Sequence, residues 1–179
     1  MLTTERLTLR PFVVEDLENF AALHADPNAM RDYGTTMSTE MSKARLDSIL
    51  EAWQHQGYGR LAVFMGPAFV GYVGVMYRDD PDHPLGTHNE IGWRLHSRFW
   101  GFGLATEAAH AVLIQAQSTF ALKDILAFTA PDNLASQAVM ARLGLLRAPD
   151  LDFSISVPSF FEHWQGLVWR VPDHFGGIE

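Results

Sequence analysis

The chain has 179 residues, of which 47% are hydrophobic and 19% are charged. This composition is typical of one globular domain and excludes a disordered chain, a collagen and a low-complexity repeat protein. The 13 basic and 21 acidic residues give a net charge of −8. A nucleic-acid-binding protein needs a basic surface, so we expect no nucleic-acid partner.

The residue types also restrict the compartment and the chemistry. The chain has no cysteine, which excludes a disulfide scaffold, a thiolate zinc site and a cysteine nucleophile, and fits a reducing compartment. The N-terminal residues lack a signal segment, and no run of about 18 apolar residues occurs. The eight histidines form no His-Glu-x-x-His motif, so no metal site is expected. We therefore expect a cytoplasmic protein without a membrane partner. We expect a monomer or a homodimer, and the sequence does not distinguish between them.

The first part of the chain predicts one strand and two helices. Polar and apolar residues alternate over residues 6–10, which predicts a strand with one buried face. Acidic residues and then apolar residues at helical spacing follow, and this second segment ends at Asp26. The next helix begins after a cap at Ser38 or Thr39 and ends near Gly57.

From residue 61 onward the pattern predicts strands. The runs 61–65 and 69–77 are rich in β-branched and aromatic residues, and a glycine-proline turn separates them. They predict an antiparallel hairpin. The segment 79–86 reads as a surface loop because it is rich in aspartate and proline. A strand over residues 88–95 follows it.

The remaining chain alternates helices and strands. A glycine turn at residues 98–103 precedes a helix of about four turns. A strand at 124–129, a helix at 133–143 and two strands near 145–153 and 161–171 complete the order. We therefore predict an α+β (mixed α/β) fold over residues 1–179, with a mixed sheet of about seven strands flanked by about four helices.

Residues 90–107 join a strand, a glycine turn and the start of a helix, which is a geometry that binds phosphate. Backbone N–H groups at a helix N-terminus lack intrahelical partners, and the helix dipole adds partial positive charge there. Gly101 and Gly103 allow the main chain to approach oxygen atoms closely, and Arg98 adds a full charge. The two glycines could equally form an ordinary tight turn.

Other nucleotide-binding motifs fit less well. The chain contains no Gly-Lys-Ser/Thr sequence, which excludes a P-loop hydrolase. A dinucleotide fingerprint needs a third glycine where Thr106 stands, although Asp124 lies at the expected distance of about 20 residues. A NAD-dependent oxidoreductase therefore stays an alternative.

Three motifs together resemble a known family. The sequence Arg98-x-x-Gly101-x-Gly103-Leu104-Ala105 resembles the acetyl-CoA-binding motif of the GNAT superfamily of N-acetyltransferases. Asn133-x-x-Ser136 followed by Leu143-Gly144-Leu145 resembles the next helix and strand of that family, and residues 6–11 resemble its opening strand. The closest resemblance is to the branch that includes the ribosomal-protein N-terminal acetyltransferases.

The resemblance implies a V-shaped mixed sheet that binds acetyl-CoA as co-substrate. Trp93, Arg94 and Leu95 would offer backbone groups to the pantetheine arm. The resemblance also assigns the following turn and helix start to the pyrophosphate: Arg98, Gly101, Phe102, Gly103, Leu104, Ala105 and Thr106. Asn133 and Ser136 would contact the cofactor from the next helix, although Asn133 could be only a helix cap.

The implied reaction is a direct attack of a neutral primary amine on the thioester in a ternary complex. Glu90 is the first candidate for the base and His88 the second, although Glu90 could instead form a salt bridge at the strand end. The family often has a tyrosine acid where Met140 stands in this chain. Either another donor such as Ser136 protonates the thiolate, or the thiolate leaves without a dedicated acid, because free thiols are moderately acidic. Met140 also motivates an alternative, a catalytically degenerate acetyl-CoA-binding sensor or partner module.

The amine could belong to a small molecule or to a peptide N-terminus. The resemblance places Asp32 and Tyr33, in the loop 30–37, at the site that binds this amine. It places the segment 154–161 there as well. Both segments could equally be plain surface loops.

Overall fold

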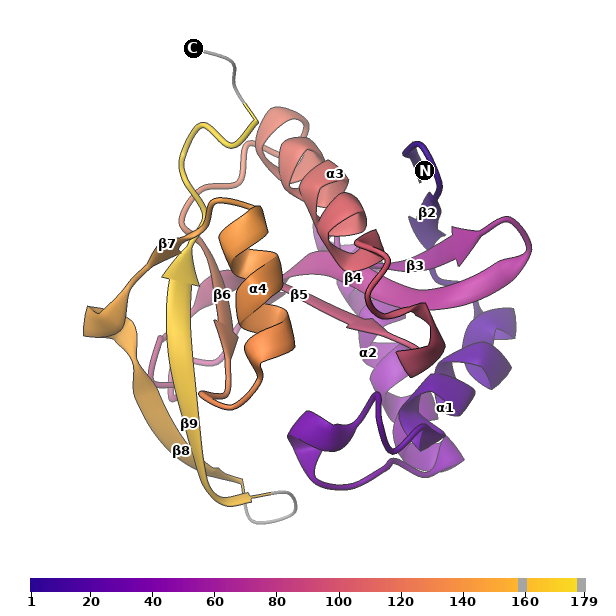
Figure 1. Cartoon of the computed structure of the whole chain (residues 1–179), viewed down its shortest axis with the longest axis horizontal. Coiled ribbons are helices and arrows are strands. Elements are labelled where there is room, and N and C mark those ends of the chain that lie inside the picture. Colours follow the sequence, from indigo (N-terminus) through magenta and orange to yellow (C-terminus); the bar gives the residue numbers. More distant parts are fainter. Residues whose placement is uncertain (158–160, 177–179) are drawn as a thin grey trace.

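The computed structural model describes residues 1–157 and 161–176, and one mixed sheet organises this part of the chain (Figure 1). The strand order is β1-β2-β3-β4-β5-β6-β9-β7, with β8 paired to β9. Strands β5 and β6 are parallel, and the other pairs are antiparallel. The strands are β1 (Leu2–Thr3), β2 (Thr8–Pro11), β3 (Arg60–Met65), β4 (Ala68–Arg78), β5 (His88–Leu95), β6 (Ile125–Thr129), β7 (Leu146–Arg147), β8 (Phe153–Val157) and β9 (Phe161–Arg170).

The described residues contain four α-helices, as predicted: α1 (Leu17–Ala25), α2 (Thr39–Gln56), α3 (Leu104–Ser118) and α4 (Leu134–Arg142). Helix α2 has the predicted ends. Ser38, not Thr39, caps it, because the Ser38 side chain accepts a hydrogen bond from the Met41 N–H at 3.2 Å. Gly57 ends it in the left-handed conformation, with φ of 73°.

The prediction of about seven strands was wrong, because the described sheet has nine. The two residues of β1 are too few to show a period of two in the sequence. The strand expected over 145–153 is instead β7, a 3-10 turn at Pro149–Leu151, and the start of β8. Proline has no N–H to donate, so Pro149 cannot continue a paired strand. Strand β9 pairs with both pieces, which only the tertiary fold brings together.

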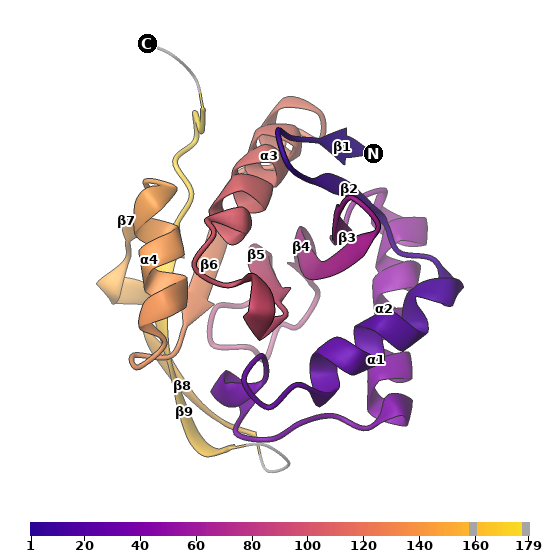
Figure 2. The same cartoon turned by 45° about the vertical axis from the view of Figure 1, so that its right-hand side comes forward.

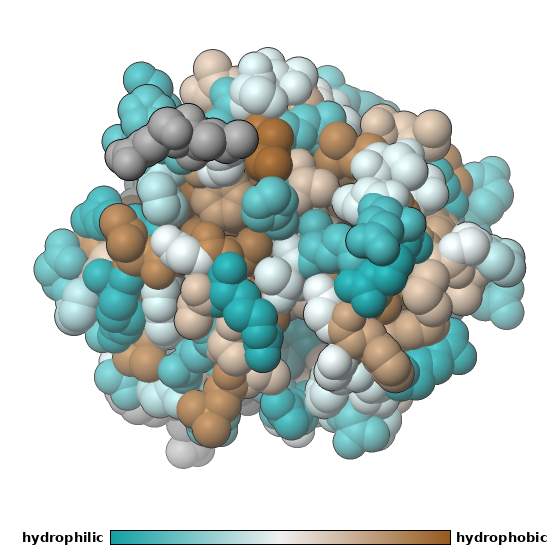
Figure 3. All heavy atoms as spheres, turned by 45° about the horizontal axis from the view of Figure 1, so that its top comes forward, coloured by the Kyte–Doolittle hydropathy of each residue, from teal (hydrophilic) through white to brown (hydrophobic). Residues whose placement is uncertain are grey.

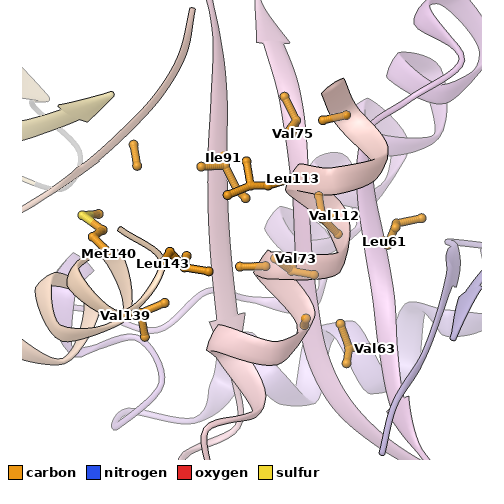
Figure 4. Packing of buried hydrophobic residues seen from close by; sticks show 14 of the residues in the cluster. Leu61, Val63, Val73, Val75, Ile91, Val112, Leu113, Val139, Met140 and Leu143 are labelled. Atoms are coloured by element: carbon orange, nitrogen blue, oxygen red, sulfur yellow. The ribbon is translucent and has the colours of Figure 1, made fainter. Parts of the chain in front are cut away.

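Helices cover both faces of the sheet (Figures 1 and 2). Helix α3 packs on one face, where Val112 and Leu113 meet Val73 and Ile91 in a cluster that includes residues of α4 (Figure 4). Helices α1 and α2 cover the other face with a second cluster around Phe20. Successive strand residues point to opposite faces, so β3 and β4 contribute to both clusters.

The sheet opens between β5 and β6. These strands pair only at Asn89–Ile125 and Glu90–Leu126, although β5 continues to Leu95 and β6 to Thr129. Helix α3 is the crossover between the two parallel strands, as the chain direction requires. The divergence produces the V shape that the family resemblance implied, and it leaves part of the β5 edge without a neighbouring strand among the described residues.

The surface carries scattered rather than continuous apolar groups. On the face seen in Figure 3, hydrophilic residues lie between hydrophobic ones. The exposed apolar side chains include Phe102, Leu134 and Leu146, which lie on different elements. Isolated apolar side chains of this kind are common on protein surfaces. In the described ranges, no helix is both long and apolar enough to cross a membrane.

Candidate active site

A cavity of about 420 Å³ lies beside the exposed edge of β5. Its walls come from the loop after α1, the end of β5, the glycine turn with the start of α3, and helix α4. Most of the residues expected to bind the cofactor line it: Trp93, Arg94, Leu95, Gly101, Gly103, Leu104, Ala105, Thr106, Asn133 and Ser136. The fold therefore brings two motifs about 30 residues apart in the sequence to one cavity.

The glycine turn leaves the start of α3 without a side-chain cap. Gly101 and Gly103 have φ values of 83° and 76°, a region in which residues with a Cβ atom are strained. Gly103 is the N-cap residue of α3, and as a glycine it has no side chain that could accept a hydrogen bond from this end. The first N–H groups of the helix thus have no intrahelical partner, which is the arrangement that binds an anion.

Thr106 adds a polar group that fits a ligand in this cavity. Its Oγ1 atom is buried and has no hydrogen-bond partner among the described residues. Buried hydroxyl groups normally have a partner, because an unpaired one loses hydration without compensation. Because Thr106 lines the cavity, an acceptor oxygen of a bound phosphate would supply that partner. The turn and this hydroxyl therefore fit the pyrophosphate of acetyl-CoA.

Two expected phosphate ligands, Arg98 and Phe102, lie outside the lining of the cavity. The Arg98 guanidinium stacks over the ring of Phe99 at 5.0 Å, and the side chain is exposed. Phe102 is 64% exposed. Two other arginines, Arg31 and Arg142, do line the cavity and were not expected there. Arg142 is the last residue of α4 and lies about a third of a turn from Ser136, so helical spacing did not indicate it.

Helix α4 presents Asn133 and Ser136 to the cavity, but not Met140. Asn133 also has the cap role that the sequence allowed, because its Oδ1 accepts the Ser136 N–H at 3.2 Å. Met140 is 2% exposed and lies in the hydrophobic cluster (Figure 4). This position thus offers neither a proton nor access to the cavity, whereas the Ser136 hydroxyl group belongs to a lining residue.

The loop after α1 is held against β5 by an ion pair. Arg94 donates to both carboxylate oxygens of Asp32, at 2.7 and 2.8 Å, and also to the Ala29 carbonyl. The Tyr33 ring lies 4.8 Å from the Arg94 guanidinium carbon. Of the two residues expected to bind the amine, Asp32 lines the cavity and Tyr33 does not. The Asp32 carboxylate already holds a cation, so it positions this wall of the cavity.

The segment 154–161 was also expected near the amine. Its residues 158–160 lie outside the described residues. Residues 154–157 belong to β8, and Phe161 begins β9. Neither strand contributes a residue to the lining of the cavity in the described part of the chain.

Glu90, the first candidate for the base, is buried in an ion-pair cluster outside the cavity lining. It pairs with Arg60 at 3.0 Å and with Arg78 at 3.2 Å. Burial by itself would raise the pKa of Glu90, but His88, Arg60 and Arg78 outweigh it and lower this pKa to about 2. The salt bridge that the sequence allowed as its alternative role is therefore present.

The partner Arg60 comes from β3, and sequence reasoning did not find it. Gly92 makes room for this guanidinium, since a Cβ atom at Gly92 would lie 2.7 Å from Arg60 Nη1. His88 lies beside the cluster, with its Nε2 atom 3.7 Å from Glu90 Oε2 and its Nδ1 atom 2.7 Å from the Gly86 carbonyl. His88 likewise does not line the cavity.

The structure defines a class of protein: a mixed α/β domain whose sheet opens beside an uncapped helix start that can bind an anion. Residues 6–146 match the family model described as Acetyltransferase (GNAT) domain, and the chain belongs to this family. Acetyl-CoA is the co-substrate of this family, and the family model is named for acetyl transfer.

Two proteins similar to this chain carry names that fit this family. The chain is 31% identical over 151 residues to the FsC-acetyl coenzyme A-N(2)-transacetylase of Aspergillus fumigatus. The match covers 80% of this chain and 64% of that protein, so the chain spans less than two thirds of the fungal relative. The crystal structure of the acetyltransferase from Agrobacterium tumefaciens str. C58 is 28% identical, with a TM-score of 0.75 and coverage of 96% and 93% of the two chains.

A more distant structure shows the same fold with coenzyme A. This is RimL, a ribosomal L7/L12 alpha-N-protein acetyltransferase in complex with coenzyme A. It is 16% identical, with a TM-score of 0.72, and the match covers 95% of this chain and 96% of that one. At this identity the likeness concerns the fold alone.

Proposed function

We propose that this chain transfers the acetyl group of acetyl-CoA to a primary amine by direct attack within a ternary complex. The observation that carries the proposal is the cavity between the open edge of β5, the uncapped start of α3 and helix α4. The open edge offers main-chain groups to an amide-containing arm, and the helix start offers N–H groups to phosphates. Acetyl-CoA has both features in one molecule.

The binding roles follow from the lining of the cavity. Trp93, Arg94 and Leu95 would hold the pantetheine arm through their main chain. The pyrophosphate would be held by Gly101, Gly103, Leu104, Ala105 and Thr106. Asn133 and Ser136 would contact the cofactor from α4. When bound, acetyl-CoA supplies an acetyl group activated as a thioester. The chain contributes the orientation of the two substrates.

The sequence made Glu90 the first candidate for the base. For the proton transfers we propose that Glu90 does not have this role. A carboxylate whose pKa is about 2 is a poor acceptor for the proton of an ammonium group, so Glu90 holds Arg60 and Arg78 instead. The amine proton passes to water in the cavity. Ser136, on the wall of the cavity, gives a proton to the departing thiolate and regains one from that water.

The acceptor is a primary amine of a small molecule or of a peptide N-terminus. The fungal relative is named for acetyl transfer to FsC, and RimL is named for a protein α-amine. The sequence likeness to the fungal relative is the higher of the two, so we place FsC first in a screen of primary amines. The ribosomal-protein branch, the cytoplasmic location and the oligomeric state stay predictions.

Thermal unfolding with different ligands tests the cofactor first. Acetyl-CoA or desulfo-CoA at about 100 times its dissociation constant should stabilise the protein by about 2.7 kcal/mol, and raise Tm by about 5 to 10 °C. A shift with NAD alone would favour the oxidoreductase alternative. Release of coenzyme A in the presence of an amine then tests the transfer. Binding without release across a broad set of primary amines would favour the sensor module.

A further inference from the structure

The sequence motif Arg-Leu-Thr-Leu-Arg has one arginine at each end, Arg6 before β2 and Arg10 within it. The two arginines have different surroundings. Each guanidinium group binds one carboxylate and one main-chain carbonyl. Arg10 binds Asp16 and the Pro11 carbonyl, both close in sequence. Arg6 instead binds residues about 100 positions away, at the glycine turn and the start of α3. Figure 2 shows the N-terminal segment passing beside α3.

The first contact of Arg6 is with Glu107, in the first turn of α3. Arg6 Nε donates to Glu107 Oε2 at 2.7 Å, and Nη2 lies 2.5 Å from the same oxygen. Glu107 Oε1 accepts the Arg6 main-chain N–H at 3.0 Å and the Thr4 hydroxyl group at 2.5 Å. The Glu107 side chain is 17% exposed. The carboxylate is therefore fixed from both oxygens by the N-terminal segment.

The second contact of Arg6 is with the glycine turn itself. Arg6 Nη1 donates to the Phe102 carbonyl at 2.9 Å. A Cβ atom placed on Gly103 would lie 3.7 Å from Arg6 Nη2, so the guanidinium group lies against the turn. Arg6 thus binds the residue before Gly103 and the helix turn after it. The planar guanidinium, with several donors in fixed directions, suits such a bridge better than a single ammonium group.

We propose that Arg6 is a positioning residue for the pyrophosphate of acetyl-CoA, because it holds the glycine turn and the start of α3 in the orientation that binds the phosphates. The inference rests on the proposed function, since it presupposes the cofactor site. The ligand meets main-chain N–H groups, and a turn that is ordered before binding loses less entropy when the ligand binds. Thr4 supports the arrangement, because its hydroxyl group binds the same Glu107 carboxylate.

The variant Arg6→Met tests this role, with Arg10→Met as the matched control on the same strand motif. The dissociation constant of desulfo-CoA, measured by calorimetry, should rise about tenfold in Arg6→Met and stay unchanged in Arg10→Met. S-acetylpantetheine lacks the pyrophosphate. Its kcat/KM with an amine should therefore be the same in Arg6→Met and in the wild type, a selectivity that general destabilisation would not produce.

A second variant separates geometry from charge and covers the case in which Arg6→Met does not fold. Arg6→Lys keeps the charge but cannot bind Phe102 and Glu107 together, so its affinity should also fall. Wild-type affinity in Arg6→Lys, or equal losses with acetyl-CoA and S-acetylpantetheine, would overturn the positioning role. Failure of the wild type to bind desulfo-CoA would instead overturn the proposed function, and this inference with it.

Discussion

Strand β5 makes two kinds of interaction, one through main-chain groups at the cavity and one through charged side chains away from it. Toward the cavity, the glycine turn and the open strand edge offer main-chain groups, and the side chains there are mostly small or apolar. Outside the cavity, Glu90 binds charged side chains from the neighbouring strands, Arg60 from β3 and Arg78 from β4. Main-chain recognition requires glycine at set positions, which leaves a short pattern in the sequence. Side-chain pairs join distant segments and leave no such pattern.

The largest effect is expected among these charged side chains, from Glu90→Gln. This change leaves the buried Arg60 guanidinium without its counter-charge, and breaking a buried pair in this way costs about 3 to 5 kcal/mol. Denaturant unfolding measures the loss, and Asp150→Asn, in an exposed pair with Arg170, should cost less than about 1 kcal/mol. A folded Glu90→Gln with unchanged stability but greatly reduced kcat would return Glu90 to the role of base.

At the cavity, Gly103→Val should weaken acetyl-CoA binding by about 100-fold, because a β-branched residue strongly disfavours the left-handed conformation of this turn. Gly86→Val is the matched control, since Gly86 has a φ of 60° in a loop outside the cavity lining. Both variants should lose stability, but only Gly103→Val should lose affinity for desulfo-CoA. Equal affinity in the two variants would show that the turn does not bind the cofactor.

A third prediction concerns the pH dependence contributed by His24, on the face covered by α1 and α2. The side chain is fully buried, and its ring nitrogens lack hydrogen-bond partners among the described residues. Burial first, and then the charges of Arg45 and Arg94, lower the pKa of His24 from 6.5 to about 3. Between these values the unfolded chain binds the proton and the folded chain does not, so the free energy of unfolding falls as the pH decreases.

The expected loss from His24 is about 1.4 kcal/mol for each pH unit below the unfolded pKa. His24→Phe removes this term, so the variant should lose less stability than the wild type between about pH 7 and about pH 5, by denaturant unfolding. His55→Gln, at an exposed position, serves as the control and should follow the wild type. A His24→Phe variant with the wild-type pH dependence would contradict the buried neutral state.

The smallest effect is expected from Ser136→Ala, again at the cavity. A thiolate is a fair leaving group by itself, so loss of the proton donor should lower kcat by only about tenfold. Affinity for desulfo-CoA should change little. Ser48→Ala, on the exposed side of α2, should leave both quantities unchanged. Unchanged kcat in Ser136→Ala would mean that the thiolate leaves without this donor.

Sequence by itself determined the local features of this protein. The helix ends at Ser38 and Gly57, the hairpin and the glycine turn depend on residues close in the chain, so their patterns could be read directly. The motif at 98–105 likewise indicated a phosphate site, because its function depends on main-chain geometry.

Only the tertiary structure decided the partners of the charged side chains. Glu90 meets Arg60, 30 positions away, and Arg6 meets Glu107, 101 positions away. No local period relates such residues, because strand pairing and helix packing bring them together. The same reason explains the two short strands β1 and β7, which exist as strands only through their partners β2 and β9. A charge in the sequence thus shows that a partner is needed, and the fold decides which one it is.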